Sequence, residues 1–326
     1  MSGRYKATPD KIIEIGEKLY NSMSDCQLCP MKCRVNRLEG ELGECHSGDK
    51  ASVASFNLHF GEEPPISGTR GSGTIFFAGC NLHCVFCQNY QISQEFRPTD
   101  QQRFSVAELA DEMLRLQGMG AHNINFVSPT HMIYQMADAV VKARQNGLAI
   151  PIVYNSNGYD SVDALRRIRG LVDIYLPDVK YIHNNLAKRF SDVKDYADVV
   201  PGVIAEMLHQ VGHLQLDDDG IAVRGLLVRH LVLPGHVANS RDCLAFLADL
   251  APEVHLSIMS QYSPQYKACD VPPLDRKLSS VEYENILNYA DVCGLQNAFI
   301  QELASQDNYV PDFYKSAPFA TGSREK

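Results

Sequence analysis

The sequence lacks the features that mark several large classes of protein. It contains no stretch of about 18 uninterrupted apolar residues, so no membrane-spanning helix is expected. Residues 1–20 (MSGRYKATPDKIIEIGEKLY) are charged and have no apolar core, so no secretory signal is expected and the protein is predicted to be cytoplasmic. Positive charge is not in excess, because 30 Lys and Arg stand against 39 Asp and Glu, for a formal net charge of −9. Since phosphate binding needs a clustered positive field, this balance argues against nucleic acid as a partner, including RNA as a substrate.

A nucleotide-binding loop is also missing, because the Gly/Pro-rich stretch 61–73 (GEEPPISGTRGSG) carries no Walker lysine. Glu62 and Glu63 in this stretch are expected either to line the mouth of an active site or to brace two modules. The histidines share no ligand spacing, so packing or surface roles are expected for them, His131 included. In a reducing compartment the ten cysteines are not expected to form disulfides, so their spacing has to explain them.

A regular alternation of short apolar runs and helical patterns begins after residue 73, and it predicts parallel βαβ units in an α/β fold. The predicted strands are Thr74–Ala78, Ile124–Val127, Ile150–Tyr154, Val172–Leu176, Leu226–Leu233 and Val254–Met259. The predicted helices are Ser105–Gln117, Ile133–Gln145, Val162–Arg169, His183–Leu208 (two helices), Arg241–Leu250 and Ser279–Ala290. The expected N-cap residues are Ser105, Ser161 and Ser279.

Six such repeats are too few for a closed eight-stranded barrel, so a partial (β/α)6 barrel is predicted, with an open doubly wound sheet as the alternative. Either architecture places the chemistry at the carboxyl ends of the strands. We expect two parts. Residues 1–70 would hold a helix over Pro9–Asn21 and a cysteine-rich metal-binding segment, and residues 71–326 would form the barrel.

Three cysteines directly follow the first predicted strand of the barrel. Cys80, Cys84 and Cys87 have the spacing C-x3-C-x2-C, and no fourth cysteine comes soon after them. Such a loop can bring three thiolates onto three irons of a [4Fe–4S] cluster and leave the fourth iron without a protein ligand. That iron could bind the amino and carboxylate groups of S-adenosylmethionine (SAM), whose reductive cleavage yields a 5′-deoxyadenosyl radical. The alternatives are a structural zinc site and cysteines that only pack.

A second group of cysteines lies closer to the N-terminus. Cys26, Cys29, Cys33 and Cys45 have the spacing C-x2-C-x3-C-x11-C. Four thiolates would close the coordination of a zinc ion or of a second iron–sulfur cluster, and the pattern does not choose between the two. The other cysteines are isolated and are expected to be ordinary small hydrophobic residues: Cys243, Cys269 and Cys293.

The cysteine motifs and the segments around them resemble those of a known protein family. The segment CNLHCVFCQNYQIS resembles the cluster loop of radical SAM proteins. Together with LHFGEEPPISGTRGSGTIFFAGC and the N-terminal CQLCPMKCRVNR, it resembles proteins identified as pyruvate formate-lyase activating enzymes. The resemblance covers nearly the whole chain. It implies a partial (β/α)6 barrel of the radical SAM type, one [4Fe–4S] cluster and SAM.

The same resemblance implies a set of SAM-binding residues. Residues 154–158 (YNSNG) align with a segment that faces SAM and reads aspartate-threonine-asparagine-glycine in activating enzymes. Where many radical SAM proteins carry Gly-Gly-Glu after strand two, residues 127–131 read VSPTH and offer two hydroxyl groups but no carboxylate. Phe86 suits stacking near an adenine, although an aromatic residue here is also typical of a core. The residues implied in the SAM pocket are Phe86, Ser128, Thr130, Asn155, Ser156, Asn157, Asp178, Lys180 and Arg229.

The leading hypothesis is therefore an oxidoreductase that cleaves SAM at the cluster and abstracts a hydrogen atom from a substrate. Activating enzymes act on a glycine of a partner enzyme, and a small molecule or another peptide is an equal alternative. An electron donor such as flavodoxin or ferredoxin is expected. The rival is a non-catalytic iron–sulfur or zinc protein that serves as an electron carrier or docking module, and it predicts no 5′-deoxyadenosine.

Overall fold

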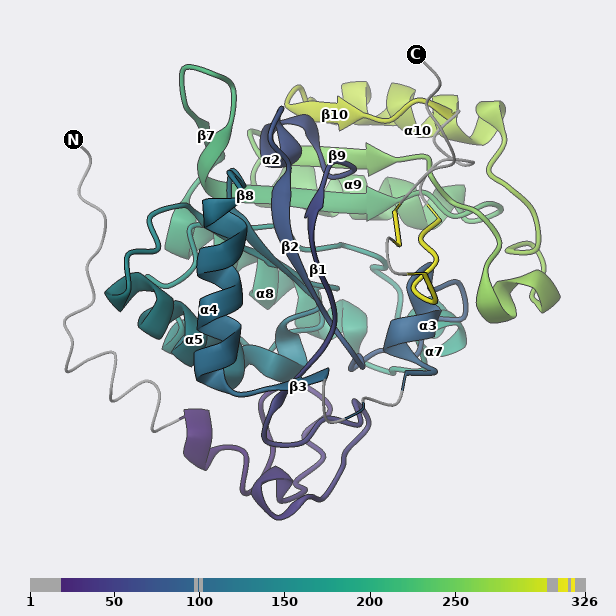
Figure 1. The fold of residues 1–326 in the computed structure, drawn as a ribbon. Coiled ribbons are helices and arrows are strands. Elements are labelled where there is room, and N and C mark those ends of the chain that lie inside the picture. Colours follow the sequence, from purple (N-terminus) through teal and green to yellow (C-terminus); the bar gives the residue numbers. More distant parts are fainter. Residues whose placement is uncertain (1–18, 97–98, 100–101, 304–309, 316–317, 320–326) are drawn as a thin grey trace.

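The structure is a computed structural model that describes residues 19–96, 99, 102–303, 310–315 and 318–319. In these residues a ten-stranded sheet forms the centre of the fold (Figure 1), in the order β10-β9-β8-β6-β5-β4-β2-β1-β3, with β7 paired to β8. The strands are β1 Ala51–His59, β2 Ser72–Phe77, β3 Arg103–Phe104, β4 Ile124–Val127, β5 Ile152–Asn155, β6 Ile174–Tyr175, β7 Gln215–Leu216, β8 Ala222–Leu231, β9 His255–Met259 and β10 Ala298–Ile300. The α-helices are α2 Pro64–Ser67, α3 Tyr90–Ser93, α4 Val106–Gly118, α5 Ile133–Gln145, α6 Val162–Arg167, α7 Asn184–Ser191, α8 Tyr196–Val211, α9 Val237–Leu250 and α10 Ser280–Val292.

The sheet is mostly parallel and does not close into a barrel. From β2 through β4, β5, β6, β8 and β9 to β10, each neighbouring pair is parallel. β1 then pairs antiparallel with β2, and β3 with β1, so that β10 and β3 stand at opposite ends of the sheet. The α/β class and the open, partial-barrel sheet predicted from the sequence are confirmed.

The helix starts expected from the sequence are confirmed at three serines. The side chains of Ser105, Ser161 and Ser279 each accept a hydrogen bond from a backbone N–H of the first helical turn. Such caps satisfy N–H groups that have no partner within the helix. Four strands were missed: β1 (ASVASFNLH) mixes polar and apolar residues, and β3, β7 and β10 are only two or three residues long.

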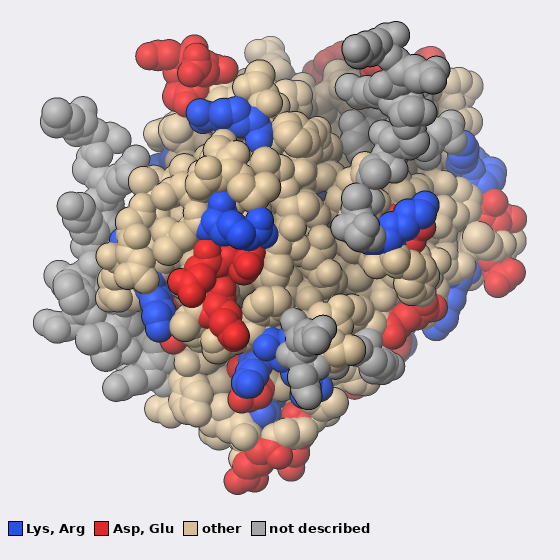
Figure 2. Space-filling model, in the orientation of Figure 1, with Lys and Arg blue, Asp and Glu red and all other residues tan. Residues whose placement is uncertain are grey.

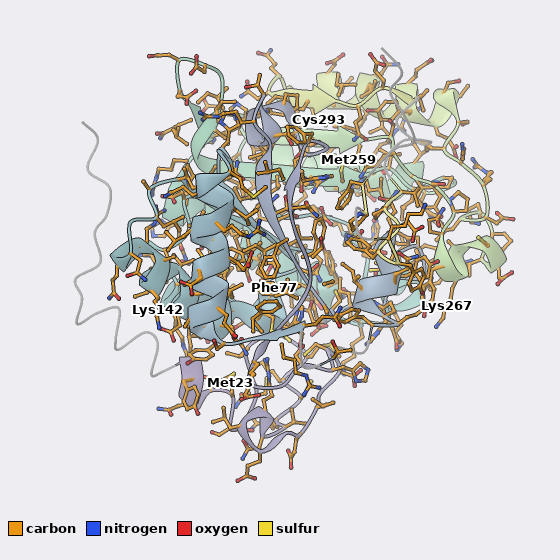
Figure 3. All side chains as sticks on the ribbon, viewed as in Figure 1. Met23, Phe77, Lys142, Met259, Lys267 and Cys293 are labelled. Carbon is orange, nitrogen blue, oxygen red and sulfur yellow. The ribbon has the colours of Figure 1, made fainter. Side chains whose placement is uncertain are left out.

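The two faces of the sheet bury different side chains, because successive residues of a strand point to opposite faces. Phe77 of β2 stacks on Phe126 of β4, with 5.7 Å between ring centroids, in the large core shared with helices such as α4 and α5 (Figure 3). Ile66 of the short helix α2 packs with Val153 of β5 and its neighbours in a second, smaller core. The loop that carries α2 therefore lies against the face of the sheet opposite to that large core.

Residues 19–50 form a segment with little regular structure that extends below the sheet in Figure 1. Most of the helix predicted for Pro9–Asn21 lies outside the described residues, and the proposed division of the chain near residue 70 stays a prediction. The segment is anchored by Met23, which is fully buried and accepts a hydrogen bond from Gln135 of α5. Within the described residues, no helix has the length and apolar character needed to cross a membrane.

Candidate functional site

The loop of Cys80, Cys84 and Cys87 follows the carboxyl end of β2, where both predicted architectures place the chemistry. Gly79 opens this loop with a φ of +81°, and a Cβ atom there would lie 2.4 Å from the carbonyl oxygen of Cys45. Since no side chain fits in that space, glycine is required where the two cysteine groups meet.

Each of the three loop sulfurs has a hydrogen-bonding partner from outside the cysteine motif. Asn157 donates from Nδ2 to Cys80 Sγ at 3.4 Å. Ser191 Oγ lies 3.0 Å from Cys84 Sγ, and Ser93 Oγ lies 3.2 Å from Cys87 Sγ. Donors to sulfur of this kind stabilise thiolates and tune iron–sulfur clusters.

Without a bound cation the three loop thiols remain protonated. Burial raises the pKa of Cys80 to about 12 and that of Cys84 to about 11, and repulsion from neighbouring thiolates adds to the effect at both. A bound metal reverses this, because its positive charge removes the proton from a coordinating thiol. The donor set therefore fits an iron–sulfur cluster.

A small cavity lies next to this loop and is lined by Phe86, Asp178 and Lys180 together with Leu231 and Leu233 of the β8 region. Lys180 Nζ lies 2.5 Å from Asp178 Oδ2, and both side chains are largely buried. Burial would lower the pKa of Lys180, but Asp178 and the Cys84 sulfur outweigh it and hold this pKa above its ordinary value. The cavity thus combines an aromatic wall with one positive and one negative charge.

Arg229 of β8 is placed in a second charged group. Its Nη1 lies 3.3 Å from Glu62 Oε2 and its Nε lies 3.1 Å from Glu63 Oε1, and all three side chains are nearly buried. Glu62 also accepts hydrogen bonds from Asn125 and from Asn155. These contacts hold the two carboxylates against β4, β5 and β8, and the two roles expected for Glu62 and Glu63 stay predictions.

The hydroxyl groups of Thr130 and Ser156 face Asp160 instead. Thr130 Oγ1 donates to Asp160 Oδ1 at 2.6 Å, Ser156 Oγ donates to Oδ2 at 2.6 Å, and Tyr154 Oη donates to Oδ1 at 2.8 Å. Burial raises the pKa of Asp160, and these three donors oppose the shift. Ser128 is held by its backbone, whose N–H donates to the carbonyl of Asn155, with a left-handed φ of +57°.

His83, inside the cysteine loop, is turned to other partners. Its Nδ1 lies 2.9 Å from Gln94 Oε1, and its Nε2 lies 3.4 Å from Glu44 Oε2. Its Nδ1 is therefore engaged by Gln94, whereas its buried Nε2 has no hydrogen-bonding partner in the described part of the chain.

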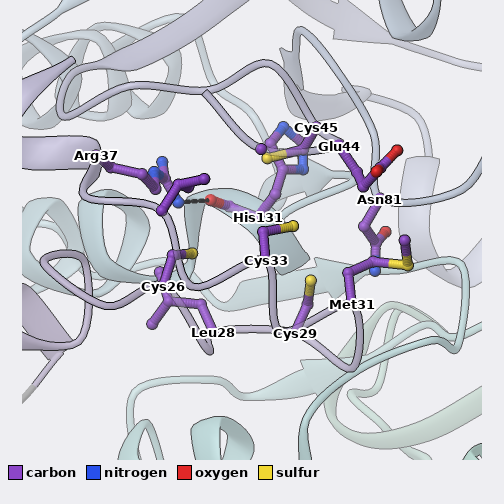
Figure 4. A pocket seen from close by; sticks show the side chains of 12 residues that line it. Cys26, Leu28, Cys29, Met31, Cys33, Arg37, Glu44, Cys45, Asn81 and His131 are labelled. Carbon is purple, nitrogen blue, oxygen red and sulfur yellow. Dashed lines mark hydrogen bonds between the residues drawn. The ribbon is translucent and has the colours of Figure 1, made fainter. Parts of the chain in front are cut away.

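The second cysteine group lines a cavity of its own. Figure 4 shows the sulfurs of Cys26, Cys29, Cys33 and Cys45 turned toward a common space, which does not include the three loop thiols. Burial raises the pKa of Cys29, and repulsion from the other three thiolates adds to that shift. Among the residues with described coordinates, however, no three or more Cys, His, Asp or Glu side chains converge on the position of a single metal ion.

Several residues at these sites carried no signal in the sequence. Ser191 and Ser93 are single serines, and Ser191 lies 107 positions from the cysteine it contacts. His131 was expected to pack or to lie at the surface, and it is indeed buried, but it lines the four-cysteine cavity. Only a pattern that relates distant positions would have identified them.

Comparison with known proteins gives a consistent result. The family model described as the radical SAM superfamily matches residues 74–208. An uncharacterized protein of Methanocaldococcus jannaschii is 32% identical over 293 residues, which are 86% of this chain and 78% of that protein. A Haemophilus influenzae protein named "Putative glycyl-radical enzyme activating enzyme" is 25% identical over 249 residues, which are 71% of this chain and 92% of that protein.

Two solved structures are more distant. Streptococcus suis SuiB bound to S-adenosylmethionine has a TM-score of 0.46 at 10% identity, with 72% of this chain and 52% of SuiB covered. HydG, a maturase of the [FeFe]-hydrogenase, has a TM-score of 0.46 at 14% identity, with 91% of this chain and 63% of HydG covered. The chain thus spans about half the length of SuiB and under two thirds of HydG.

Proposed function

The chain belongs to the radical SAM superfamily, and from that premise we propose that it cleaves SAM reductively at a [4Fe–4S] cluster ligated by Cys80, Cys84 and Cys87. Membership implies the cluster and SAM. The observation that carries the proposal is the arrangement at the carboxyl end of β2. Three thiols, one buried and two partly buried, each have a hydrogen-bonding partner at sulfur and stand beside a cavity with two opposite charges.

The ligand count supports an open position on the cluster. The loop supplies three thiolates for four irons, and the other cysteine group lines a different cavity. An open coordination position is the mark of a reactive metal site, as catalytic zinc sites also show. When bound, the cluster supplies one electron to the sulfonium of SAM, which yields methionine and a 5′-deoxyadenosyl radical.

The residues around the adjacent cavity have the charges that SAM requires. Lys180 is placed to attract the carboxylate of SAM, while Asp178 is placed to attract its ammonium group or sulfonium. Phe86 offers an apolar face for the adenine, and Asn157 orients the loop through Cys80. Arg229 and Asn155 do not line this cavity, and each of them contacts Glu62 instead.

The substrate belongs to the same proposal. We propose that the radical abstracts a hydrogen atom from a glycine of a partner protein, as in the activation of glycyl-radical enzymes. The name of the Haemophilus influenzae relative supports this assignment. The electron is expected from a small one-electron carrier such as flavodoxin or ferredoxin. On the face drawn in Figure 2, acidic and basic side chains are interspersed, which suits a protein partner better than a polyanion.

The test is anaerobic reconstitution with iron and sulfide, followed by incubation with SAM and dithionite. The full chain should produce 5′-deoxyadenosine. Cys84→Ala should produce none, whereas Cys269→Ala, at an exposed cysteine, should match the unmodified protein. If Cys84→Ala keeps full iron content and product formation, the ligand assignment is wrong. If the unmodified protein with a full iron content makes no 5′-deoxyadenosine, the non-catalytic iron–sulfur protein takes its place.

A further inference from the structure

The cavity lined by Cys26, Cys29, Cys33 and Cys45, which we call the four-thiol cavity, is not used by the chemistry proposed above. Its walls are completed by apolar side chains such as Leu28 and Met31, and its volume is about 350 Å³ including its opening to solvent. A thiol-lined space with apolar walls is a usual surrounding of an iron–sulfur cluster.

The chain is folded tightly to bring these thiols together. The backbone N–H of Cys26 donates to Val35 O at 3.0 Å, and the N–H of Arg34 donates to Cys26 O at 3.0 Å, so that Cys33 is turned back toward Cys26. Lys32 and Arg34 have left-handed φ values of 45° and 57°, which are costly for residues with side chains. Such a conformation persists only where the surrounding structure holds it, and here the turn around Cys26 and Cys33 does so.

Gly43 and Arg37 also help to form the four-thiol cavity. A Cβ atom at Gly43 would lie 2.8 Å from Cys33 Sγ, so glycine leaves room for that thiol. Arg37 is 1% exposed and ties the segment to the barrel: its Nη2 donates to Gly48 O at 2.6 Å and its Nη1 donates to His131 O at 2.8 Å (Figure 4).

His131 gives an independent sign of a missing partner. It is 2% exposed and lines the same cavity. Its Nε2 lies 2.9 Å from the carbonyl oxygen of Ala78 and must donate to it, which leaves Nδ1 with a free lone pair. That Nδ1 atom is buried and has no hydrogen-bonding partner. The wall of the four-thiol cavity therefore contains a buried polar atom that no described residue satisfies.

We propose that Cys26, Cys29, Cys33 and Cys45 ligate a second iron–sulfur cluster, a [4Fe–4S] cubane with a protein thiolate on each of its four irons. The competing ligand is one zinc ion, which would draw four sulfurs to about 2.3 Å from a single point. Within the described residues neither cysteine group converges in that way, including the loop of the three cysteines that the family assigns to a cubane. Four thiolates spaced C-x2-C-x3-C-x11-C around one cavity can each take one iron of a cubane.

The position of this second cluster defines its relation to the first. The cavity shares Asn81 with the loop of Cys80, and Cys45 O stands against Gly79 at the start of that loop. Because protein thiolates occupy all four irons, this cluster offers no position for SAM. It therefore has a structural role beside the loop of Cys80, Cys84 and Cys87 and does not take part in SAM binding.

The test uses the full chain, purified and reconstituted under anaerobic conditions. Two cubanes correspond to about eight irons and eight sulfides per chain and no stoichiometric zinc. The double variant Cys26→Ser with Cys33→Ser should keep about half of the iron, whereas Cys269→Ser should keep all of it. Electron paramagnetic resonance of the reduced protein should show two signals, of which SAM shifts only one. The double variant should lose the signal that SAM does not shift.

Three results would overturn the second cluster. One zinc with about four irons per chain would make the site a zinc site, and about four irons without zinc would leave the cavity without metal. A SAM-induced shift of both signals would show that the second centre has an open iron. The elemental analysis needs no variant, so it decides the matter even if the double variant does not fold. Failure of the first cluster is distinguishable, because it would remove the SAM-shifted signal and 5′-deoxyadenosine while sparing the other signal.

Discussion

The two cysteine groups of this protein are built in different ways. The four N-terminal thiols lie within twenty positions, in residues 26–45, and local turns bring them together. The three loop thiols depend on remote residues, since Ser191 and Asn157 reach their sulfurs from other parts of the sheet and its helices. The proposed closed centre takes all of its cysteines from one short segment, whereas the proposed open centre also takes partners at sulfur from distant parts of the fold.

The two cysteine groups also differ in the charged side chains around them. The loop thiols stand near the ion pair of Lys180 and Asp178, whose charges are available to a polar ligand. The four-thiol cavity is walled by apolar side chains, by Arg37 with its donors already engaged, and by His131, whose pKa burial lowers to about 4. The surroundings of the loop thiols therefore suit the binding of a polar ligand, whereas those of the four-thiol cavity suit the proposed enclosed metal centre.

Metal removal should affect the two regions most unequally. Stripping iron with a chelator and an oxidant should unfold residues 26–45, because in small metal-binding segments the binding free energy, on the order of 10 kcal/mol, is also the folding free energy. Trypsin should then cut after the exposed Lys32 and Arg34 at least about tenfold faster, while sites in α5 such as Lys142 stay protected. Mass spectrometry of the fragments measures this, and unchanged cleavage at Lys32 would mean that metal does not hold the segment.

The contact between the two regions can be broken at Gly79. Gly79→Ala places a Cβ against Cys45 O at a positive φ, so we expect a loss of about 2–4 kcal/mol in the free energy of unfolding. Gly118→Ala is the matched control, because Gly118 lies in α4 with nothing within 4 Å, and alanine there should stabilise by up to about 1 kcal/mol. Anaerobic urea denaturation compares them, and equal midpoints would show that the two cysteine groups do not meet as described.

A smaller effect is expected on KM for SAM when the charged cavity beside the loop thiols is changed and the four-thiol cavity is left intact. Lys180→Met leaves Asp178 largely buried without its partner and removes the positive charge for the SAM carboxylate, which should raise KM for SAM about 10- to 100-fold. Lys188→Met removes an exposed lysine that pairs with Asp192, and KM should not change. Steady-state assays of 5′-deoxyadenosine measure both, while the iron content of both variants should match the unmodified protein. An unchanged KM in Lys180→Met would remove Lys180 from the SAM pocket.

The smallest expected effect is on the loop cluster alone. Ser191→Ala removes the hydroxyl at Cys84 Sγ, and because such a donor favours the more negative reduced state, the reduction potential should fall by about 40 mV, equivalent to about 1 kcal/mol. Ser93→Ala should act in the same direction through Cys87. A redox titration followed by electron paramagnetic resonance would show whether the second cluster keeps its potential. Equal shifts of both clusters would contradict the separation of the two regions.

Much of the fold was predictable because its signals are local. The predicted strand Ile124–Val127 and helix Ile133–Gln145 match the structure at both ends, since apolar periodicity acts within one element. β1 was missed because its stability comes from antiparallel pairing with β2, and its own residues show no strong pattern. The N-terminal helix and the division of the chain remain predictions.

By itself, the sequence determined the spacing of both cysteine groups and the succession of strands and helices, because these depend on residues close together in the chain. Only the tertiary structure decided which side chains surround the thiols. It placed Glu62 and Glu63 on Arg229, 166 or more positions away, Ser191 on Cys84, and His131 beside the four-thiol cavity. Such contacts have no local pattern, because they arise where a sheet of parallel strands brings distant loops to the same edge.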